Sequence, residues 1–133
     1  MVFVDTSFWY ALRVVRDAQH RDARALLDTV ANRTLVTTNL ILGELWTLLV
    51  RRADHDAAVR TDRAVRQRRG LRLERVEPGD EAAAWAWLYD HDERECSFVD
   101  ATSYAVMRRL GLSEALGFDG DFAAAGFTEL RPG

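Results

Sequence analysis

The sequence predicts an α/β domain of three layers, in which a central parallel β-sheet of about five strands lies between helices. Short apolar or β-branched runs alternate with longer stretches of helical periodicity along the chain. Strands separated by helices imply right-handed crossovers, which give parallel neighbours covered on both faces. The length of 133 residues, of which 48% are hydrophobic, suits a single domain over residues 1–133 with a core of its own.

The predicted strands are short. Val2-Phe3-Val4 is an apolar run that stops at Asp5-Thr6-Ser7, whose side chains favour the start of a helix. A second candidate, Thr34-Leu35-Val36-Thr37, is rich in β-branched residues. Three further strands are expected at 71–76, 114–117 and 127–130, and the pattern is weakest at 114–117.

The predicted helices are recognised by their boundaries and by their apolar faces. Ser97 favours a helix start and Gly111 a helix end, so these two residues delimit one helix. Pro78 near the start of another helix, and Gly70 at the end of a polar one, act in the same way. The full set is 8–15, 18–31, 39–52, 54–69, 78–88 and 98–110, with a short helix that starts near Asp119.

Composition excludes several classes of protein. All 18 basic residues are arginine, so the lysine that a P-loop or a Schiff-base enzyme requires is absent. No G-x-G-x-x-G turn supports dinucleotide binding, and the lone Cys96 can form neither an internal disulfide nor a zinc site. The start of the chain does not resemble a signal peptide, and the longest apolar run, 82–89, is too short to span a membrane. We therefore expect a protein of the reducing cytoplasm without a membrane partner.

Acidic residues stand where the predicted strands end. Asp5 follows the first strand, and Asp119 and Asp121 follow the fourth. Glu44 lies in the first half of the helix after the second strand, and Asp100 lies in the first turn of the sixth predicted helix. Because ligands bind outside the carboxyl ends of parallel strands, we expect these carboxylates to face one cleft.

Such a cluster needs positive charge. Two carboxylates roughly 4 Å apart repel by about 4 kcal/mol at an effective dielectric constant of about 20. That is a large part of a folding free energy of about 5–15 kcal/mol, so protons or a divalent cation must relieve the repulsion. Oxygen ligands without His or Cys suit Mg²⁺ or Mn²⁺, and such a site is suited to the hydrolysis of phosphodiester bonds.

Each carboxylate also has a purely structural interpretation. Asp5 could cap the helix that follows it, and Ser97 with Asp100 forms an S-x-x-D capping box. Glu44 could belong to a solvated helix surface, and Asp119 could cap the last short helix. Their shared position at one end of the sheet favours a functional cluster over several separate structural roles.

Four segments resemble the signature of the PIN-domain family. They are Val2-Phe3-Val4-Asp5-Thr6-Ser7, Leu42-Gly43-Glu44-Leu45, Ser97-Phe98-Val99-Asp100-Ala101 and Phe118-Asp119-Gly120-Asp121-Phe122. Their order and spacing along the whole chain resemble VapC-type toxins of toxin–antitoxin pairs. The resemblance implies a PIN-like fold and a Mg²⁺/Mn²⁺-dependent endoribonuclease that cuts tRNA or rRNA. It also implies inhibition by a cognate VapB-type antitoxin, and a homodimer.

The resemblance assigns roles to individual residues. The family's acidic positions map onto Asp5, Glu44, Asp100 and Asp119, which it makes the metal-binding and catalytic residues. Asp121 matches a position that varies within the family and is a further candidate ligand.

Hydroxyl residues are expected to support these carboxylates. Thr6 or Ser7 resembles the hydroxyl that holds the family's first aspartate in place. Ser97 would support Asp100 through the capping box. The acidic pattern shows no departure that suggests an inactive copy.

Arginine is concentrated in one segment. Nine arginines against four acidic residues give residues 51–75 a formal charge of +5, whereas nine arginines against 17 acidic residues leave −8 on the rest of the chain. One interpretation is an RNA-binding edge, because guanidinium groups pair with phosphates. The other is a solvated helix face with i,i+4 pairs such as Asp56–Arg60 and Asp62–Arg66. The candidate RNA-binding residues are Arg51, Arg52, Arg66, Arg68 and Arg69.

Two other classes of function are alternatives. The chain could be a non-catalytic binding module that docks RNA or a partner helix, and Trp9 and Trp46 could then line its groove. Core packing is the simpler role for these tryptophans. A phosphatase of the haloacid-dehalogenase type fits less well, because Asp5 is not followed by the second aspartate of a D-x-D motif and that family's signature lysine is absent.

Overall fold

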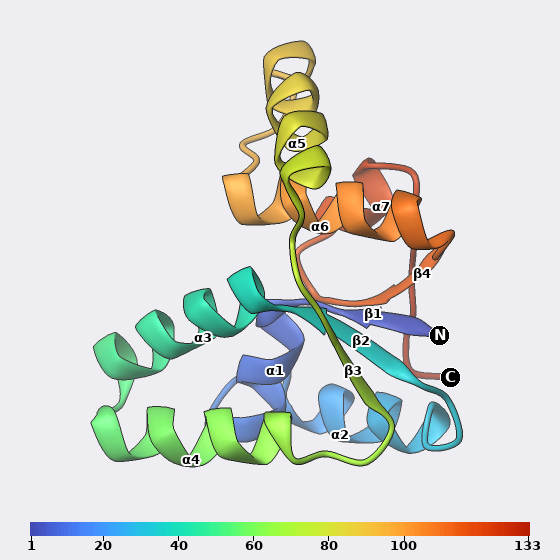
Figure 1. The fold of residues 1–133 in the computed structure, drawn as a ribbon. Coiled ribbons are helices and arrows are strands. Elements are labelled where there is room, and N and C mark those ends of the chain that lie inside the picture. The colour runs from blue at the N-terminus through green and yellow to red at the C-terminus, as the bar shows by residue number, and fades with distance from the viewer.

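The computed structural model describes residues 1–133 and contains one five-stranded sheet (Figure 1). The strand order is β3-β2-β1-β4-β5, and every pairing is parallel. The predicted fold class and the parallel sheet are therefore confirmed, since helices separate the strands along the chain. The strands are β1 (Val2–Val4), β2 (Leu35–Thr38), β3 (Leu71–Glu74), β4 (Glu114–Leu116) and β5 (Thr128–Glu129).

Helices form a layer on each side of the sheet. In Figure 1, α1, α2 and α4 lie below the sheet, α5, α6 and α7 lie above it, and α3 runs outward from the end of β2. None of the helices combines the length and the apolar character needed to cross a membrane. Their bounds are α1 (Thr6–Arg13), α2 (His20–Thr29), α3 (Asn39–Arg52), α4 (His55–Arg66), α5 (Pro78–Asp90), α6 (Phe98–Leu110) and α7 (Asp121–Ala124).

Helix starts differ from the predicted ranges where a cap decides them. Helix α1 begins at Thr6 rather than at Phe8, because the Asp5 side chain accepts a hydrogen bond from the Ser7 backbone N–H as the N-cap. The structural interpretation of Asp5 is thus confirmed. This role does not exclude a functional one, because a carboxylate has a second oxygen.

The last helix starts later than expected. Helix α7 begins at Asp121, and Gly120, with φ of 78°, occupies the N-cap position. Asp119 is therefore not the cap of this helix. By contrast, the boundaries of α6 are as predicted, since Ser97 forms the capping box with Asp100 and Gly111 ends the helix with φ of 70°.

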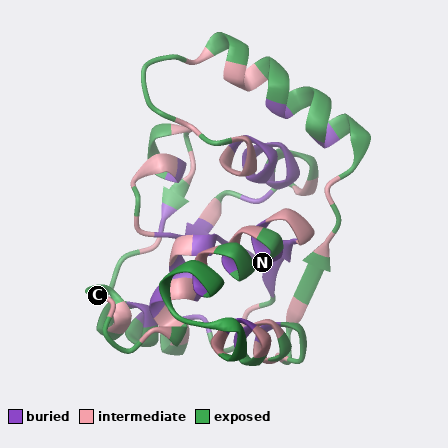
Figure 2. Cartoon of the chain, turned by 90° about the vertical axis from the view of Figure 1, so that its left-hand side faces the viewer, coloured by how far each residue is buried: buried purple, intermediate pink, exposed green.

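The core surrounds β1, which lies in the middle of the sheet and is completely buried. Helix α6 presents an unbroken buried run, Ala101–Met107, whereas α5 buries only Asp80 and Ala84. Figure 2 shows this contrast as a purple α6 beneath a mostly green α5. Trp9 is 1% exposed and its Nε1 donates to Thr37 Oγ1 at 3.2 Å, so it packs in the core, although it also contributes to a small hollow beside Val65 and Arg68.

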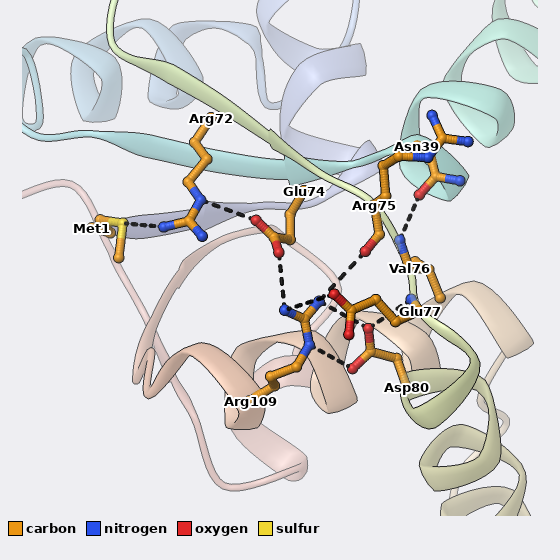
Figure 3. A network of polar contacts seen from close by, with 9 residues as sticks. All are labelled: Met1, Asn39, Arg72, Glu74, Arg75, Val76, Glu77, Asp80 and Arg109. Carbon is orange, nitrogen blue, oxygen red and sulfur yellow. Dashed lines mark hydrogen bonds and ion pairs between the residues drawn. The ribbon is translucent and has the colours of Figure 1, made fainter.

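Arg109 on α6 ties that helix to the junction between β3 and α5 (Figure 3). Its Nε and Nη2 each lie 2.9 Å from a carboxylate oxygen of Asp80, and its Nη1 lies 2.9 Å from Glu74 Oε1. Burial opposes the ionisation of Asp80, but hydrogen bonds from Arg109 and from the Glu77 backbone N–H outweigh it and hold the pKa of Asp80 below its usual value. This two-pronged pair fixes α6 against its neighbours.

Replacement of Arg109 by alanine should lower the free energy of unfolding by about 2–3 kcal/mol, because Asp80 is then buried without its cation. Urea denaturation near pH 7 measures the loss. Arg60→Ala is the matched control, since the partners of the Arg60–Asp56 pair are 68% and 76% exposed and such a pair contributes about 0.5 kcal/mol or less. Equal losses in the two variants would contradict the role given to Arg109.

Candidate active site

Four of the five predicted carboxylates line one cleft of about 570 Å³ at the carboxyl ends of the strands. Asp5 comes from the end of β1, Glu44 from α3, Asp100 from the first turn of α6, and Asp119 from the turn after β4. The parallel topology therefore brings together residues that are far apart in the sequence, as predicted.

Asp5 is held rigidly but keeps one oxygen free. Its backbone N–H donates to Leu116 O at 3.0 Å, which joins it to β4. Its Oδ2 accepts from Ser7 Oγ at 2.9 Å, and its Oδ1 is buried without any hydrogen-bond partner. A buried polar atom without a partner is costly, so this oxygen is available for a ligand.

The hydroxyl residues divide the supporting roles between them. Ser7, rather than Thr6, binds the Asp5 carboxylate, and Ser7 Oγ also accepts from the Phe118 backbone N–H at 3.2 Å. Thr6 Oγ1 is buried in the same cleft without a hydrogen-bond partner. Ser97 supports Asp100 as predicted, because the Ser97 N–H donates to Asp100 Oδ2 at 3.2 Å.

Asp121 does not line this cleft. Its Oδ1 lies 2.7 Å from Arg94 Nη2 in an ion pair. There it lines a small separate hollow together with Cys96 and Tyr104. The structure thus separates the two aspartates of the Asp119-Gly120-Asp121 segment and leaves only Asp119 in the cleft.

Charge repulsion is concentrated on the four converging carboxylates. Burial, and then the charges of Asp119 and Asp100, raise the pKa of Asp5 to about 7, although the Ser7 hydrogen bond opposes the shift. Burial is also the main cause that raises the pKa of Glu44, Asp100 and Asp119. The charges of Asp100 and Asp119 add to it at Glu44, and the charge of Asp121, from outside the cleft, adds to it at Asp100 and Asp119. Burial and mutual repulsion therefore oppose the ionisation of these carboxyl groups, and a bound cation would relieve both effects.

The residues fit a hard divalent cation. All the negatively charged side chains that line the cleft are carboxylates, and it holds no His or Cys; such oxygen ligands suit Mg²⁺ and Mn²⁺. As they stand, no three Asp, Glu, His or Cys side chains lie close enough together to enclose an ion. A Mg²⁺ site does not require that, because this ion keeps several water molecules and takes one or two carboxylates directly. Asp5 Oδ1, which is buried without a hydrogen-bond partner, is the oxygen best suited to bind the cation directly.

Of the five candidate RNA-binding arginines, only Arg52 lines the cleft. Its guanidinium carbon lies 5.5 Å from the centre of the Tyr10 ring. Arg66 is engaged with Asp62 at 2.9 Å, and the predicted Asp56–Arg60 pair also forms, so the solvated-face interpretation holds for that side of α4.

Five further residues line the cleft and were not candidate site residues in the sequence: Tyr10, Asp17, Gln19, Leu48 and Phe118. Tyr10 lies three residues after Ser7, so helical spacing along α1 could have indicated that it shares a face with the site. Asp17 and Gln19 come from the connection between α1 and α2, where no periodicity gives a signal.

Comparison with known proteins agrees with this geometry. The PIN-domain family matches residues 2–128 of the chain. The chain belongs to the PIN-domain family. A curated relative of this PIN domain, the 23S rRNA-specific endonuclease VapC20 of Mycobacterium tuberculosis, is 53% identical over 132 residues and is covered to 99% in both chains.

Solved structures extend the comparison. The crystal structure of Mycobacterium tuberculosis VapC20, described as a sarcin–ricin loop cleaving toxin, superposes with a TM-score of 0.92 at 52% identity and covers 99% of this chain and 100% of that one. A toxin–antitoxin complex from Klebsiella pneumoniae has a TM-score of 0.73 at 14% identity, covering 100% of this chain and 98% of the other. The crystal structure of FitAcB from Neisseria gonorrhoeae has a TM-score of 0.72 at 16% identity, covering 99% of this chain and 98% of the other. The last two share the fold with this PIN domain.

Asp5→Asn should stabilise the metal-free protein at pH 8 by about 1–2 kcal/mol, although it removes a residue of the site. The folded state holds the Asp5 proton up to about pH 7, whereas an ordinary aspartate of pKa 3.8 releases it much earlier. Ionised Asp5 therefore costs stability increasingly as the pH rises from about 4 to 7, and asparagine, which also caps helices, removes that cost.

Thermal unfolding in EDTA at pH 5 and pH 8 measures this effect. The advantage of Asp5→Asn should be small at pH 5 and largest at pH 8. A variant less stable than the wild type at pH 8 would show that Asp5 is not under electrostatic strain.

Proposed function

We propose that this PIN domain is a Mg²⁺/Mn²⁺-dependent endoribonuclease that hydrolyses phosphodiester bonds of ribosomal RNA, with 23S rRNA as the substrate class, and is the toxin of a VapBC-type toxin–antitoxin pair. The observation that carries the proposal is the 53% identity to VapC20, which extends over 99% of both chains. The four carboxylates in one cleft support it independently, since they match the chemistry of phosphodiester hydrolysis. The likeness to VapC20 favours rRNA over tRNA within the range that the sequence predicts.

Asp5, Glu44, Asp100 and Asp119 would hold the cation and form the catalytic set. A bound Mg²⁺ or Mn²⁺ supplies a water of lowered pKa and offsets negative charge on the reacting phosphate. Ser7 orients Asp5, and the capping box with Ser97 orients Asp100. Burial is the main cause that raises the pKa of Glu44, so a cation held beside it would favour its ionised form.

Asp100→Asn should reduce RNA cleavage at least 100-fold with the fold intact, because asparagine can still accept the Ser97 N–H but carries no charge for the cation. Cleavage of 23S rRNA is measured with Mn²⁺, with and without EDTA. Asp62→Asn is the matched control, since Asp62 belongs to an exposed pair on α4, away from the cleft.

Two outcomes would contradict the proposal. Undiminished cleavage by Asp100→Asn would show that Asp100 does not belong to the catalytic site. RNA binding without any cleavage in Mn²⁺ would favour the alternative of a non-catalytic binding module. Millimolar Mn²⁺ should also raise the melting temperature of the wild type, and of Asp62→Asn by the same amount.

Arg52 is the arginine best placed to hold the RNA backbone at this site. It lines the same cleft as the carboxylates, and it forms none of the ion pairs that engage the other arginines described above. The Tyr10 ring beside it restricts the guanidinium without using its N–H donors. A cation with free donors at the rim of an acidic cleft offsets the repulsion between the cleft and a phosphate.

Arg52→Ala should raise the KM for RNA about tenfold with little change in kcat, and it should weaken the salt dependence of binding. Steady-state cleavage at several salt concentrations measures both. Arg21→Ala on the exposed face of α2 is the control and should leave both values unchanged. A loss of kcat instead of KM would contradict a role in holding the substrate.

The partners follow from the same proposal. A cognate VapB-type antitoxin would occupy the groove between α1 and α3–α4, where Val15, 76% exposed, lies beside Arg16 and Arg60. A basic rim around apolar groups suits an amphipathic segment with acidic residues.

A second copy of the chain would pack on the outer face of α5, where Trp85 is 48% and Tyr89 83% exposed. An enzyme that cuts ribosomal RNA would act in the cytoplasm. The proposal places the whole activity in one domain over residues 1–133.

A further inference from the structure

The turn that carries Asp119 has little structure of its own. It joins the three-residue strand β4 to the four-residue helix α7, and Asp119 itself is exposed. A side chain on such a turn keeps a fixed place in a cleft only if neighbouring elements hold the backbone. The contacts of this turn therefore decide how well Asp119 is aligned with Asp5.

Glu129 on β5 forms hydrogen bonds with the backbone of this turn. Its carboxylate accepts from the Gly120 N–H at 3.3 Å and from the Ala123 N–H at 2.9 Å, so it satisfies backbone donors at the start of α7. The Glu129 side chain is only 1% exposed, and Arg131 Nη2 lies 3.0 Å from its Oε1. A buried carboxylate with these partners does not line the cleft, so its place is not explained by contact with substrate.

Two arginines complete the hold on the same turn. Arg131 Nη1 donates to Gly117 O at 3.3 Å, and Arg94 Nη2 donates to Asp119 O at 3.4 Å. Gly117, at the start of the turn, lies against Asp5: a Cβ on Gly117 would be in van der Waals contact with the Asp5 Cβ, at 3.4 Å. The same hydrogen bonds that hold the turn therefore set where Asp119 lies relative to Asp5.

We propose that Glu129, together with Arg94 and Arg131, is a positioning residue of the nuclease site and sets Asp119 against Asp5. The inference rests on the proposed function, because it assigns the alignment of two of the proposed metal-binding carboxylates. The inference gives β5, a strand of only two residues, a role in the site because it carries Glu129. Groups that orient a metal ligand typically contribute about 10–100-fold to metal affinity or activity.

Glu129→Gln is the first test. Gly120 N–H and Ala123 N–H bind different oxygens of Glu129, and in glutamine one of these oxygens is replaced by an NH₂ donor, so one of the two hydrogen bonds is lost. Calorimetric titration with Mn²⁺ should show binding weakened about tenfold, and the kcat for RNA should fall by a similar factor with KM unchanged. A merely structural role would lower the melting temperature and leave Mn²⁺ affinity and kcat unchanged in the folded variant.

Arg94→Ala tests the same point without changing a buried side chain, since Arg94 is 49% exposed. It should change Mn²⁺ affinity and kcat in the same direction, and it decides the matter if Glu129→Gln does not fold. Glu114→Gln is the control, because Glu114 pairs with Arg33 at the opposite end of β4.

The wild type and Asp100→Asn, measured in the same series, separate the two proposals. A wild type that binds Mn²⁺ and cuts RNA, beside folded Glu129→Gln and Arg94→Ala variants with unchanged values, overturns the positioning role alone. A wild type that neither binds Mn²⁺ nor cuts RNA overturns the proposed function, and the positioning role with it.

Discussion

The site depends above all on how Asp5 is held at the buried end of the central strand. The apolar residues of β1 place the start of α1 inside the molecule, where Ser7 occupies one oxygen of Asp5 and leaves the other without a partner. Burial alone would favour a protonated carboxyl group, and the other carboxylates strengthen that tendency. A cation relieves both effects at once, which explains why a fold would keep such an unfavourable arrangement.

Carboxylates outside the cleft are paired with arginines, so the electrostatic repulsion is confined to the cleft. Arg109 neutralises Asp80 above the sheet, Arg94 neutralises Asp121, and Arg131 neutralises Glu129. The four carboxylates of the cleft have no comparable ion pair. Because buried acids elsewhere are paired, the unpaired group stands out as a functional site rather than as a general feature of an acidic protein.

Local signals and topology made much of the fold and the site predictable. The apolar β1 run, the Asp5 cap and the Ser97–Asp100 capping box depend on neighbours in the sequence, and all three are confirmed. The gathering of the carboxylates at one edge follows from parallel strands, so it too could be inferred without coordinates.

What could not be predicted depends on partners that are distant in the sequence. The direction of Asp121 is decided by Arg94, 27 residues away in a loop, and the burial of Asp80 by Arg109, 29 residues away. Only the packing of α1 against α3 shows that Arg52, and not its neighbour Arg51, lines the cleft beside Tyr10. Charge counts along a segment cannot distinguish two adjacent arginines.

The sheet order has a consequence for folding. β1 is made first, but its partner β4 and the Asp119 turn belong to the C-terminal part of the chain. The first half of the chain therefore supplies Asp5 and Glu44 but neither Asp100 nor Asp119. The cleft is complete only when β4 has paired with β1, so the folding of the C-terminal half and the assembly of the acidic site are a single event.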